Sequence, residues 1–396
     1  MHELQAAFAE LIASPQQQAL LQQARSVESL LTQLRRLWCL PAWNDAQLMQ
    51  ALEQVNQAAA VPAAALVAGG WLPHRYEART RSIQWCLPDG PATEPFHDEY
   101  IGRCLQRQPL NQFLRPRTPL ATLAGLGTDL GPKRPVRRPA GFIFHLSRCG
   151  STLVSGCLSE LDSTMVLSEP PVLTELLLDP TLRAEEKRQA ISGLLAVIGT
   201  TVPGRQDLVI KWNAWDLLQW ELLRDLYPQV PCLLLVRDPV EILASHHRQC
   251  GRHMSGDPSL ARLAPVFDLQ SDRQPFVSVL DHRIRVLQAL MQRMRELHDG
   301  HGLPVLDYGR LGPETLERIA HGFGLASSNA ALARMAVRLR QHAKALDQRF
   351  VPDGFSKAAV FDARDRHLIE SRLAEPYAHL LRRAGSFDSL EVLHAT

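Results

Sequence analysis

A glycine-containing turn near the middle of the chain has the residue types that bind an anion. In the stretch Leu146-Ser-Arg-Cys-Gly-Ser-Thr-Leu153, Gly150 follows an apolar run and allows close backbone approach. Ser151 and Thr152 then open a helical pattern, so backbone N–H groups, two hydroxyls and a helix dipole would converge on an anion. Arg148 would add a full positive charge. A Walker A loop has Lys directly after its last Gly, where this chain has Ser151, so the turn predicts an anion site of another kind.

A second turn of the same type follows the apolar run Cys232-Leu-Leu-Leu-Val236. Arg237 stands at the end of this predicted strand, and Ser245 lies eight residues on (245 − 237), about two helical turns away. A single arginine at a strand end is usually a salt-bridged rim residue. Two such arginines on one sheet, each beside a helix, suit a ligand with two separated anionic groups.

Short apolar runs alternate with helical patterns from residue 140 onward. The predicted strands are 141–146, 165–167, 208–210, 232–236 and 304–306. The predicted helices are 152–161, 214–226, one from residue 240, and 277–298. This alternation predicts a mainly parallel sheet with helices on both faces. Ligands bind beyond the carboxyl ends of the strands in such sheets, which is where both turns lie.

Changes in composition divide the chain into three regions. Residues 1–114 open with apolar residues at three- and four-residue steps and predict a mainly helical module of unknown role. Residues 115–139 are rich in Pro and Arg and predict a linker. Residues 140–396 form the predicted nucleotide-binding catalytic domain.

The composition of the 396-residue chain restricts its class. A formal net charge of +2 disfavours a nucleic-acid partner, and 45% hydrophobic residues can build a large core. The N-terminal stretch 1–18 lacks the pattern of a signal or transit peptide, and no apolar run approaches the ~18 to 20 residues of a membrane span. The seven cysteines form no CxxC pair. We therefore expect a reduced, cytoplasmic protein without a membrane partner.

The two turns resemble the phosphate-binding motifs of sulfotransferases that use 3′-phosphoadenosine 5′-phosphosulfate (PAPS). Ser147-Arg-Cys-Gly-Ser-Thr152 is similar to that family's Pro-Lys/Arg-Ser-Gly-Thr-Thr loop, closest to the tyrosylprotein type, which also has Arg. Arg237 and Ser245 match the family's Arg-Asp/Asn…Ser spacing. The resemblance covers about residues 140–325. It implies a P-loop-like three-layer α/β/α fold, PAPS as donor, 3′,5′-adenosine bisphosphate (PAP) as product, and no metal.

The resemblance also implies residue roles. The donor site would consist of Arg148, Cys149, Gly150, Ser151, Thr152, Arg237, Ser245 and Lys357. Lys357 belongs to a segment in the place of the family's late, basic nucleotide loop. Tyr308 resembles the tyrosine of a family strand end and is either a nucleotide contact or a core-edge residue.

The catalytic base departs from the cytosolic subfamily. That subfamily has a base His two residues after a strand-end Lys, whereas here Lys211 is followed by Asn213. Glu169 follows the second predicted strand, and its distance from Arg148 (169 − 148 = 21 residues) matches the interval in tyrosylprotein sulfotransferases. Glu169 is therefore the predicted base, provided that partial burial raises its pKa. Arg148 and Lys211 are predicted to stabilise the developing negative charge.

Other interpretations stay open at this point. His246 and His247 are rival bases, and Glu169 could instead be an acid that complements a helix dipole. A P-loop phosphotransferase or a non-catalytic nucleotide-binding module are the alternatives to a sulfotransferase. His97 and Glu99 superficially form a metal pair, but no third ligand is identifiable and no metal is expected. The acceptor, a small molecule or a peptide, and the oligomeric state are not specified by the sequence.

Overall fold

The chain forms two compact units. The computed structural model describes residues 2–58, 60–123, 139–200, 205–255, 278–341 and 360–382. The first unit consists of Met1–Arg138 and Pro170–Pro203, and the second of Pro139–Glu169 and Gly204–Thr396. The first unit therefore includes a segment from within the sequence range predicted to be the catalytic domain.

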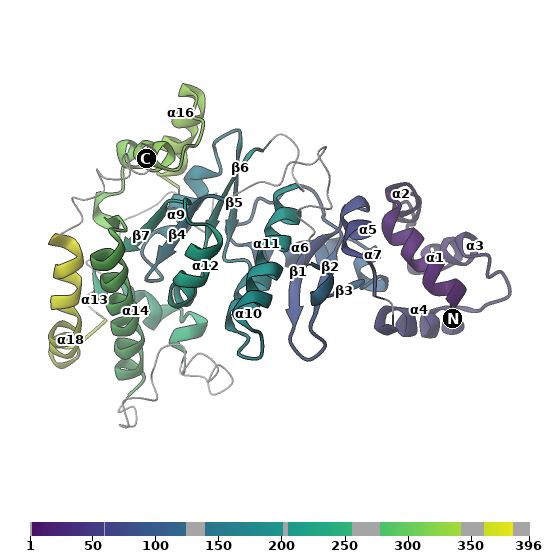
Figure 1. The fold of residues 1–396 in the computed structure, drawn as a ribbon, viewed down its shortest axis with the longest axis horizontal. Coiled ribbons are helices and arrows are strands. Elements are labelled where there is room, and N and C mark those ends of the chain that lie inside the picture. Colours follow the sequence, from purple (N-terminus) through teal and green to yellow (C-terminus); the bar gives the residue numbers. More distant parts are fainter. Residues whose placement is uncertain are drawn as a thin grey trace. The chain divides into compact units, whose positions relative to one another are not determined.

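Five parallel strands form the sheet of the second unit (Figure 1). Their order is β5-β6-β4-β7-β8, so the first strand in sequence lies in the centre. The strands are β4 (Pro139–His145), β5 (Thr164–Ser168), β6 (Asp207–Lys211), β7 (Cys232–Val236) and β8 (Val305–Asp307). All five predicted strands are present. Every residue of β7 is buried, as expected for a parallel strand covered on both faces.

Alternate residues of β4 pack on opposite faces of the sheet. On one face, Ile143 joins a core cluster with α9 (Ser151–Leu158), α15 (Pro313–Gly322) and α16 (Asn329–Arg338). On the other face, the ring centroid of Phe142 lies 5.5 Å from that of Trp212, and Phe144 stacks on Trp212 at 6.4 Å. This alternation follows from the two-residue period of a strand.

The second face of the sheet is covered by helices as well. The 3₁₀ helix η2 (Ala214–Gln219) packs against β4, and α14 (Val279–His301) packs against η2 and against α18 (Ala363–Arg382). The remaining elements of this unit are α12 (Trp220–Leu226), α13 (Pro239–Arg248), η3 (Arg252–Met254) and η5 (Tyr308–Arg310). The predicted three-layer α/β/α fold with a parallel sheet is confirmed.

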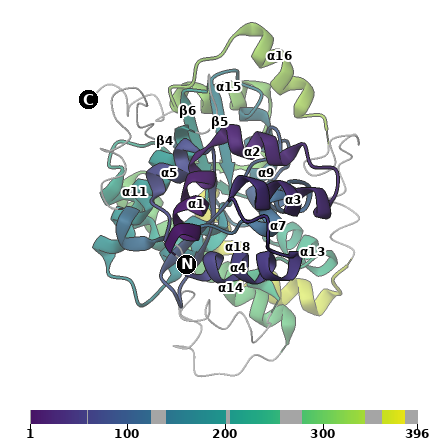
Figure 2. The same cartoon turned by 90° about the vertical axis from the view of Figure 1, so that its right-hand side faces the viewer.

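The first unit is helical at its start and contains a small sheet. Helices α1 (His2–Ala13), α2 (Pro15–Gln22), α3 (Val27–Leu37) and α4 (Asp45–Ala58) lie together (Figure 2). The other elements are α5 (Ala63–Ala68), β1 (Leu72–Glu77), β2 (Ser82–Cys86), α6 (His97–Arg107), α7 (Leu110–Phe113), β3 (Arg117–Pro119), η1 (Leu120–Leu123), α10 (Pro171–Leu178) and α11 (Ala184–Thr200). Strands β1, β2 and β3 pair antiparallel, and β3 falls within the stretch predicted as a linker.

Specific hydrogen bonds hold the segment 170–203 in the first unit. The Tyr76 hydroxyl on β1 donates to Asp179 Oδ2 at 2.7 Å, and the Tyr76 N–H donates to Glu175 Oε2 at 2.8 Å. Helix α10 also packs on β1. These contacts are non-local, which is why local patterns in the sequence did not reveal them.

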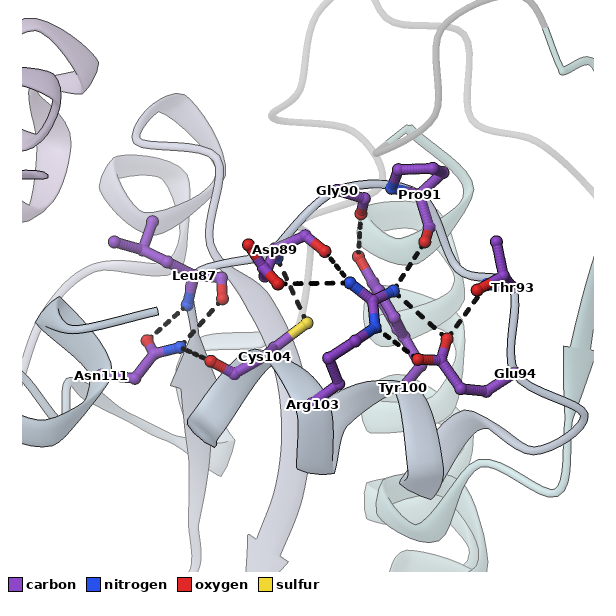
Figure 3. Close-up of polar contacts among 10 residues, drawn as sticks. All are labelled: Leu87, Asp89, Gly90, Pro91, Thr93, Glu94, Tyr100, Arg103, Cys104 and Asn111. Atoms are coloured by element: carbon purple, nitrogen blue, oxygen red, sulfur yellow. Dashed lines mark hydrogen bonds and ion pairs between the residues drawn. The ribbon is translucent and has the colours of Figure 1, made fainter. Parts of the chain in front are cut away.

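The irregular segment before α6 is fixed by one arginine (Figure 3). Arg103 forms ion pairs with Glu94 and Asp89, and its Nη2 donates to the Pro91 carbonyl at 2.7 Å. The Asn111 side chain bonds both backbone groups of Leu87, at 2.7 and 2.9 Å. Side chains thus satisfy backbone groups that no regular element pairs.

Within the part of the chain that the structure describes, no helix combines the length and apolar character needed to cross a membrane.

Gly141 on β4 tests the packing of the sheet. A Cβ atom at this position would overlap the ring of Phe323, which is 2% exposed. Gly141→Ala should therefore lower the free energy of unfolding by about 1 to 3 kcal/mol, as overpacking does. Gly300→Ala is the matched control, because Gly300 is an exposed helix residue with open space around it and should gain up to about 1 kcal/mol. Urea unfolding of both variants measures this, and equal midpoints for the two would contradict the packing described.

Candidate functional site

The predicted site residues lie at one edge of the second unit's sheet. Lys211, the last residue of β6, is paired in register with Ser168 of β5 and with Ile143 of β4. His145, the last residue of β4, is paired with Leu235 of β7. The chain visits β5 and β6 on one side of β4 and then β7 on the other. This makes β4 a topological switch point, the place where ligands bind in such sheets.

The loop after β4 has an unusual backbone. Ser147 and Arg148 have φ angles of 66° and 51°, and Gly150 has a φ of 85°. Left-handed conformations of non-glycine residues are uncommon and cost of order 1 to 3 kcal/mol each. In turns of this kind, successive backbone N–H groups form a concave anion site. The strain therefore agrees with an anion-binding role for the loop.

Gly150 is required by both its conformation and its surroundings. It is the left-handed N-cap residue of α9, and its carbonyl accepts the N–H groups of Leu153 and Val154 at 2.9 and 3.0 Å. A Cβ atom here would overlap the Tyr308 ring. The start of α9 is thus held against the residue that follows β8. The sequence indicated close backbone approach at Gly150, but neither its left-handed conformation nor its contact with Tyr308.

The side chains of this loop have different surroundings. Cys149 is fully buried in a core cluster, and burial raises the pKa of its thiol to about 12, so the side chain fills space and is not a nucleophile. Arg148 Nη2 donates to the Gln249 carbonyl at 2.9 Å. The Thr152 hydroxyl accepts a hydrogen bond from Lys211 Nζ at 3.2 Å. Ser151 is buried.

The second turn is linked directly to the first. Arg237 Nη1 donates to the carbonyl of Arg148 at 3.2 Å, so the two predicted anion sites are neighbours. The Arg237 guanidinium lies 4.2 Å from the centroid of the Tyr308 ring, which is a cation–π contact. Its Nε also donates to Glu241 Oε2 at 2.6 Å. Ser245 lies on α13, where its carbonyl accepts the Gln249 N–H at 3.1 Å.

Glu169 and Lys211 form an ion pair at the centre of the edge. Lys211 Nζ lies 2.8 Å from Glu169 Oε1, and the lysine side chain is 0% exposed, whereas that of Glu169 is 24% exposed. Glu169 has a left-handed φ of 51°, and its N–H donates to the Lys211 carbonyl at 2.7 Å. The structure therefore brings together Glu169 after β5, Lys211 at the end of β6 and Thr152 in the first turn of α9.

The pKa of Glu169 differs from the sequence prediction. Burial alone raises the pKa of this carboxyl, as expected, but the charge of Lys211 and the nearby His145 outweigh it. The net result is a pKa well below the ordinary value. The expected rise in pKa from burial is thus outweighed, because Lys211 is in direct contact with the carboxylate.

His145 is a site residue that the sequence analysis missed. Its Nε2 lies 3.4 Å from Glu169 Oε1, and its Nδ1 accepts the N–H of Ser147 at 2.9 Å. Burial lowers the pKa of His145, and the facing Glu169 opposes that effect without reversing it. The accepting Nδ1 assigns the proton of the neutral ring to Nε2, on the side of Glu169. Its position directly before the loop was the only sequence signal for it.

The two rival histidines have other contacts. His246 is buried, its Nδ1 accepts the Gly251 N–H at 3.1 Å, and its ring lies 5.5 Å from that of His253. His247 is exposed, with its ring 6.1 Å from that of Phe361. Both sets of contacts favour packing roles.

Three further positions were considered from the sequence: Lys357, Asn213 and His97. Lys357 lies outside the described residues. Asn213, which stands where the cytosolic subfamily has its base, caps η2, and its N–H donates to Asp216 Oδ2 at 2.9 Å. His97 is buried at the start of α6, and burial lowers its pKa to about 4. Among the described residues, no cluster of three or more His, Cys, Asp or Glu side chains could hold a metal ion.

Comparison with known proteins finds similar solved structures, among them two sulfotransferases. No protein-family model and no curated protein matches the chain. The sulfotransferase from Alicyclobacillus acidocaldarius is 15% identical, with a TM-score of 0.40 over 63% of this chain and 97% of its own. Sulfotransferase STF9 from Mycobacterium avium is 15% identical, with a TM-score of 0.39 over 67% of this chain and 81% of its own. At this level of similarity, function has to be inferred from the site residues.

The ion pair predicts how stability depends on pH. The pKa of Glu169 is lower in the folded chain than the ordinary glutamate value of 4.5, so its ionised form stabilises the fold above that value. This stabilisation is lost as the pH falls from 4.5 through the lower folded-state pKa. The urea midpoint of unfolding should therefore be higher for wild type than for Glu169→Gln at pH 7. The difference between the two midpoints should become smaller below pH 4.5.

The exposed Glu314 supplies the control for this measurement. Glu314→Gln should change the free energy of unfolding by no more than about 0.5 kcal/mol at either pH, as most surface substitutions do. A gap between wild type and Glu169→Gln that stays constant from pH 7 to pH 3.5 would contradict the ion pair.

Proposed function

We propose that the protein is a PAPS-dependent sulfotransferase. The observation that carries the proposal is the hydrogen bond from Arg237 to the Arg148 carbonyl, which makes two anion-binding turns into one surface. PAPS has anionic groups at both ends of its nucleoside, the 5′-phosphosulfate and the 3′-phosphate. A donor of this shape uses both turns at once, whereas an anion with a single charged group uses only one.

Each end of the donor has a defined set of partners in this proposal. The loop 146–152 binds the 5′-phosphosulfate through backbone N–H groups, the hydroxyls of Ser151 and Thr152, and Arg148. Arg237 and Ser245 bind the 3′-phosphate. The Tyr308 ring supports this arrangement, because it contacts the Arg237 guanidinium and closes against Gly150.

The chemistry is an in-line transfer of the sulfuryl group. The acceptor oxygen forms a bond to sulfur while the bond from sulfur to the bridging oxygen breaks, and its electron pair stays on PAP. Glu169 takes the proton of the acceptor hydroxyl or amine. Arg148 and the loop N–H groups stabilise the sulfuryl oxygens, and Lys211 stabilises the bridging oxygen. Positioning and fixed charges supply the rate in this scheme, as they do in phosphoryl transfer.

Glu169 is the better base for geometric reasons. Lys211 Nζ lies 2.8 Å from the Glu169 carboxylate and 3.2 Å from the Thr152 hydroxyl, so one ammonium group connects the carboxylate to the loop 146–152. The His246 imidazole is instead buried and bonded to a backbone N–H, and His247 packs against Phe361.

The cytoplasm is proposed as the place of action, because all seven cysteines are free thiols, as expected in a reducing compartment.

Calorimetric titration with PAP tests the proposed donor site. PAP should bind equally well with and without magnesium, and Arg237→Ala should weaken binding about ten- to one-hundred-fold, since a hydrogen bond to a charged group contributes ~1.5 to 3 kcal/mol. Arg340→Ala is the control, because this arginine is exposed on the same unit, and it should leave the affinity unchanged. ADP in parallel distinguishes a phosphotransferase: binding of ADP only with magnesium, and none of PAP, would sink the proposal.

A further inference from the structure

We propose that Lys211 alternates between two partners, Glu169 in the free protein and the bridging oxygen of the donor in the complex, so that donor binding releases the base. This inference rests on the proposed sulfotransferase function and adds a regulatory step to it. Glu169 would then be a competent base only when the donor already occupies the loop 146–152.

The position of Lys211 allows both contacts. Its side chain is 0% exposed, and Nζ lies 2.8 Å from Glu169 Oε1 and 3.2 Å from Thr152 Oγ1. Thr152 is in the first turn of α9, whose N-terminus faces the loop that would hold the phosphosulfate. The ammonium group is thus already shared between the base and the anion site. In the proposed exchange, this group moves from one partner to the other on its flexible four-carbon stem.

The free protein has a poor base. A carboxylate in direct contact with a buried ammonium group is stabilised in its ionised form, which lowers its pKa and its affinity for the acceptor proton. Burial of the same carboxyl acts in the opposite direction. When Lys211 leaves, burial and the newly bound anion both raise the pKa of Glu169, and the base becomes stronger at the moment it is needed.

The other groups that face Glu169 keep it in place during this exchange. They come from three further segments: His145 at the end of β4, Arg148 in the loop, and His253 in η3, which interacts electrostatically with Glu169. His145 Nε2 lies 3.4 Å from the same Oε1 that Lys211 contacts, and the Ser147 N–H fixes the ring through Nδ1 at 2.9 Å. The Glu169 backbone is held by its hydrogen bond to the Lys211 carbonyl at 2.7 Å. Only the ammonium group has to move.

Proton uptake on ligand binding tests the exchange. PAP carries the oxygen that bridges phosphorus and sulfur in the donor, so it should draw Lys211 away from Glu169. Titration calorimetry at pH 5.5 in two buffers of different ionisation enthalpy gives the number of protons taken up per PAP bound. Wild type should take up at least about 0.3 proton more than Glu169→Gln, because Glu169 gains a proton when its pKa rises towards the working pH. PAP is the same ligand in both titrations, so the protonation of its free phosphates is common to the two proteins.

Two variants complete the experiment. Glu169→Gln keeps the size of the side chain, and Lys211→Met removes the exchanging cation, so Lys211→Met should abolish the extra proton uptake while PAP still binds. Equal proton uptake by wild type and Glu169→Gln, with PAP bound to both, would overturn the exchange and leave the donor site intact. Failure of PAP to bind wild type would instead overturn the proposed function, and the exchange with it.

Discussion

A lysine ammonium group without access to water needs a negatively charged partner, and this constraint organises the edge of the sheet. Removing such an ion from water costs several kcal/mol unless a well-placed partner and further hydrogen bonds compensate. Lys211 is 0% exposed, and its charge is met by Glu169 at 2.8 Å and by the Thr152 hydroxyl at 3.2 Å. These partners come from the turns after β5 and β4. The ends of three strands must therefore stay in register for the fold to tolerate this lysine.

The order of the strands makes that register possible. Because β6 lies between β5 and β4, Lys211 is opposite Ser168 on one side and Ile143 on the other. The residue after Ser168 is Glu169, and the loop 146–152 begins directly after His145, the last residue of β4. On the far side of β4, β7 brings Arg237 to the same edge, where it bonds the loop carbonyl of Arg148. The topology of one parallel sheet thus brings the proposed base, the lysine and the two proposed anion-binding turns to one edge.

Much of this could be predicted from local sequence, because strands, turns and helix starts have short-range signatures. The five strands follow from their apolar runs, and the turn that leads from β4 into α9 follows from Gly150, Ser151 and Thr152 after a strand. The effect on the pKa of Glu169 could not be predicted, because it depends on the distance to a lysine on another strand. His145 escaped notice for the same reason: its role comes from the facing carboxylate. The placement of residues 170–203 with the first unit depends on contacts of Tyr76 with Glu175 and Asp179, which lie 99 and 103 residues further along the chain.

The most direct test of the central claim is a crystal structure of the protein with PAP bound. The account predicts the 5′-phosphate within hydrogen-bond distance of the backbone N–H groups of the loop 146–152, and the 3′-phosphate on Arg237 and Ser245. It also predicts that Lys211 Nζ contacts the 5′-phosphate and no longer lies within hydrogen-bond distance of Glu169. PAP bound elsewhere, or with its 3′-phosphate away from Arg237, would contradict the assignment of the two turns to a single donor.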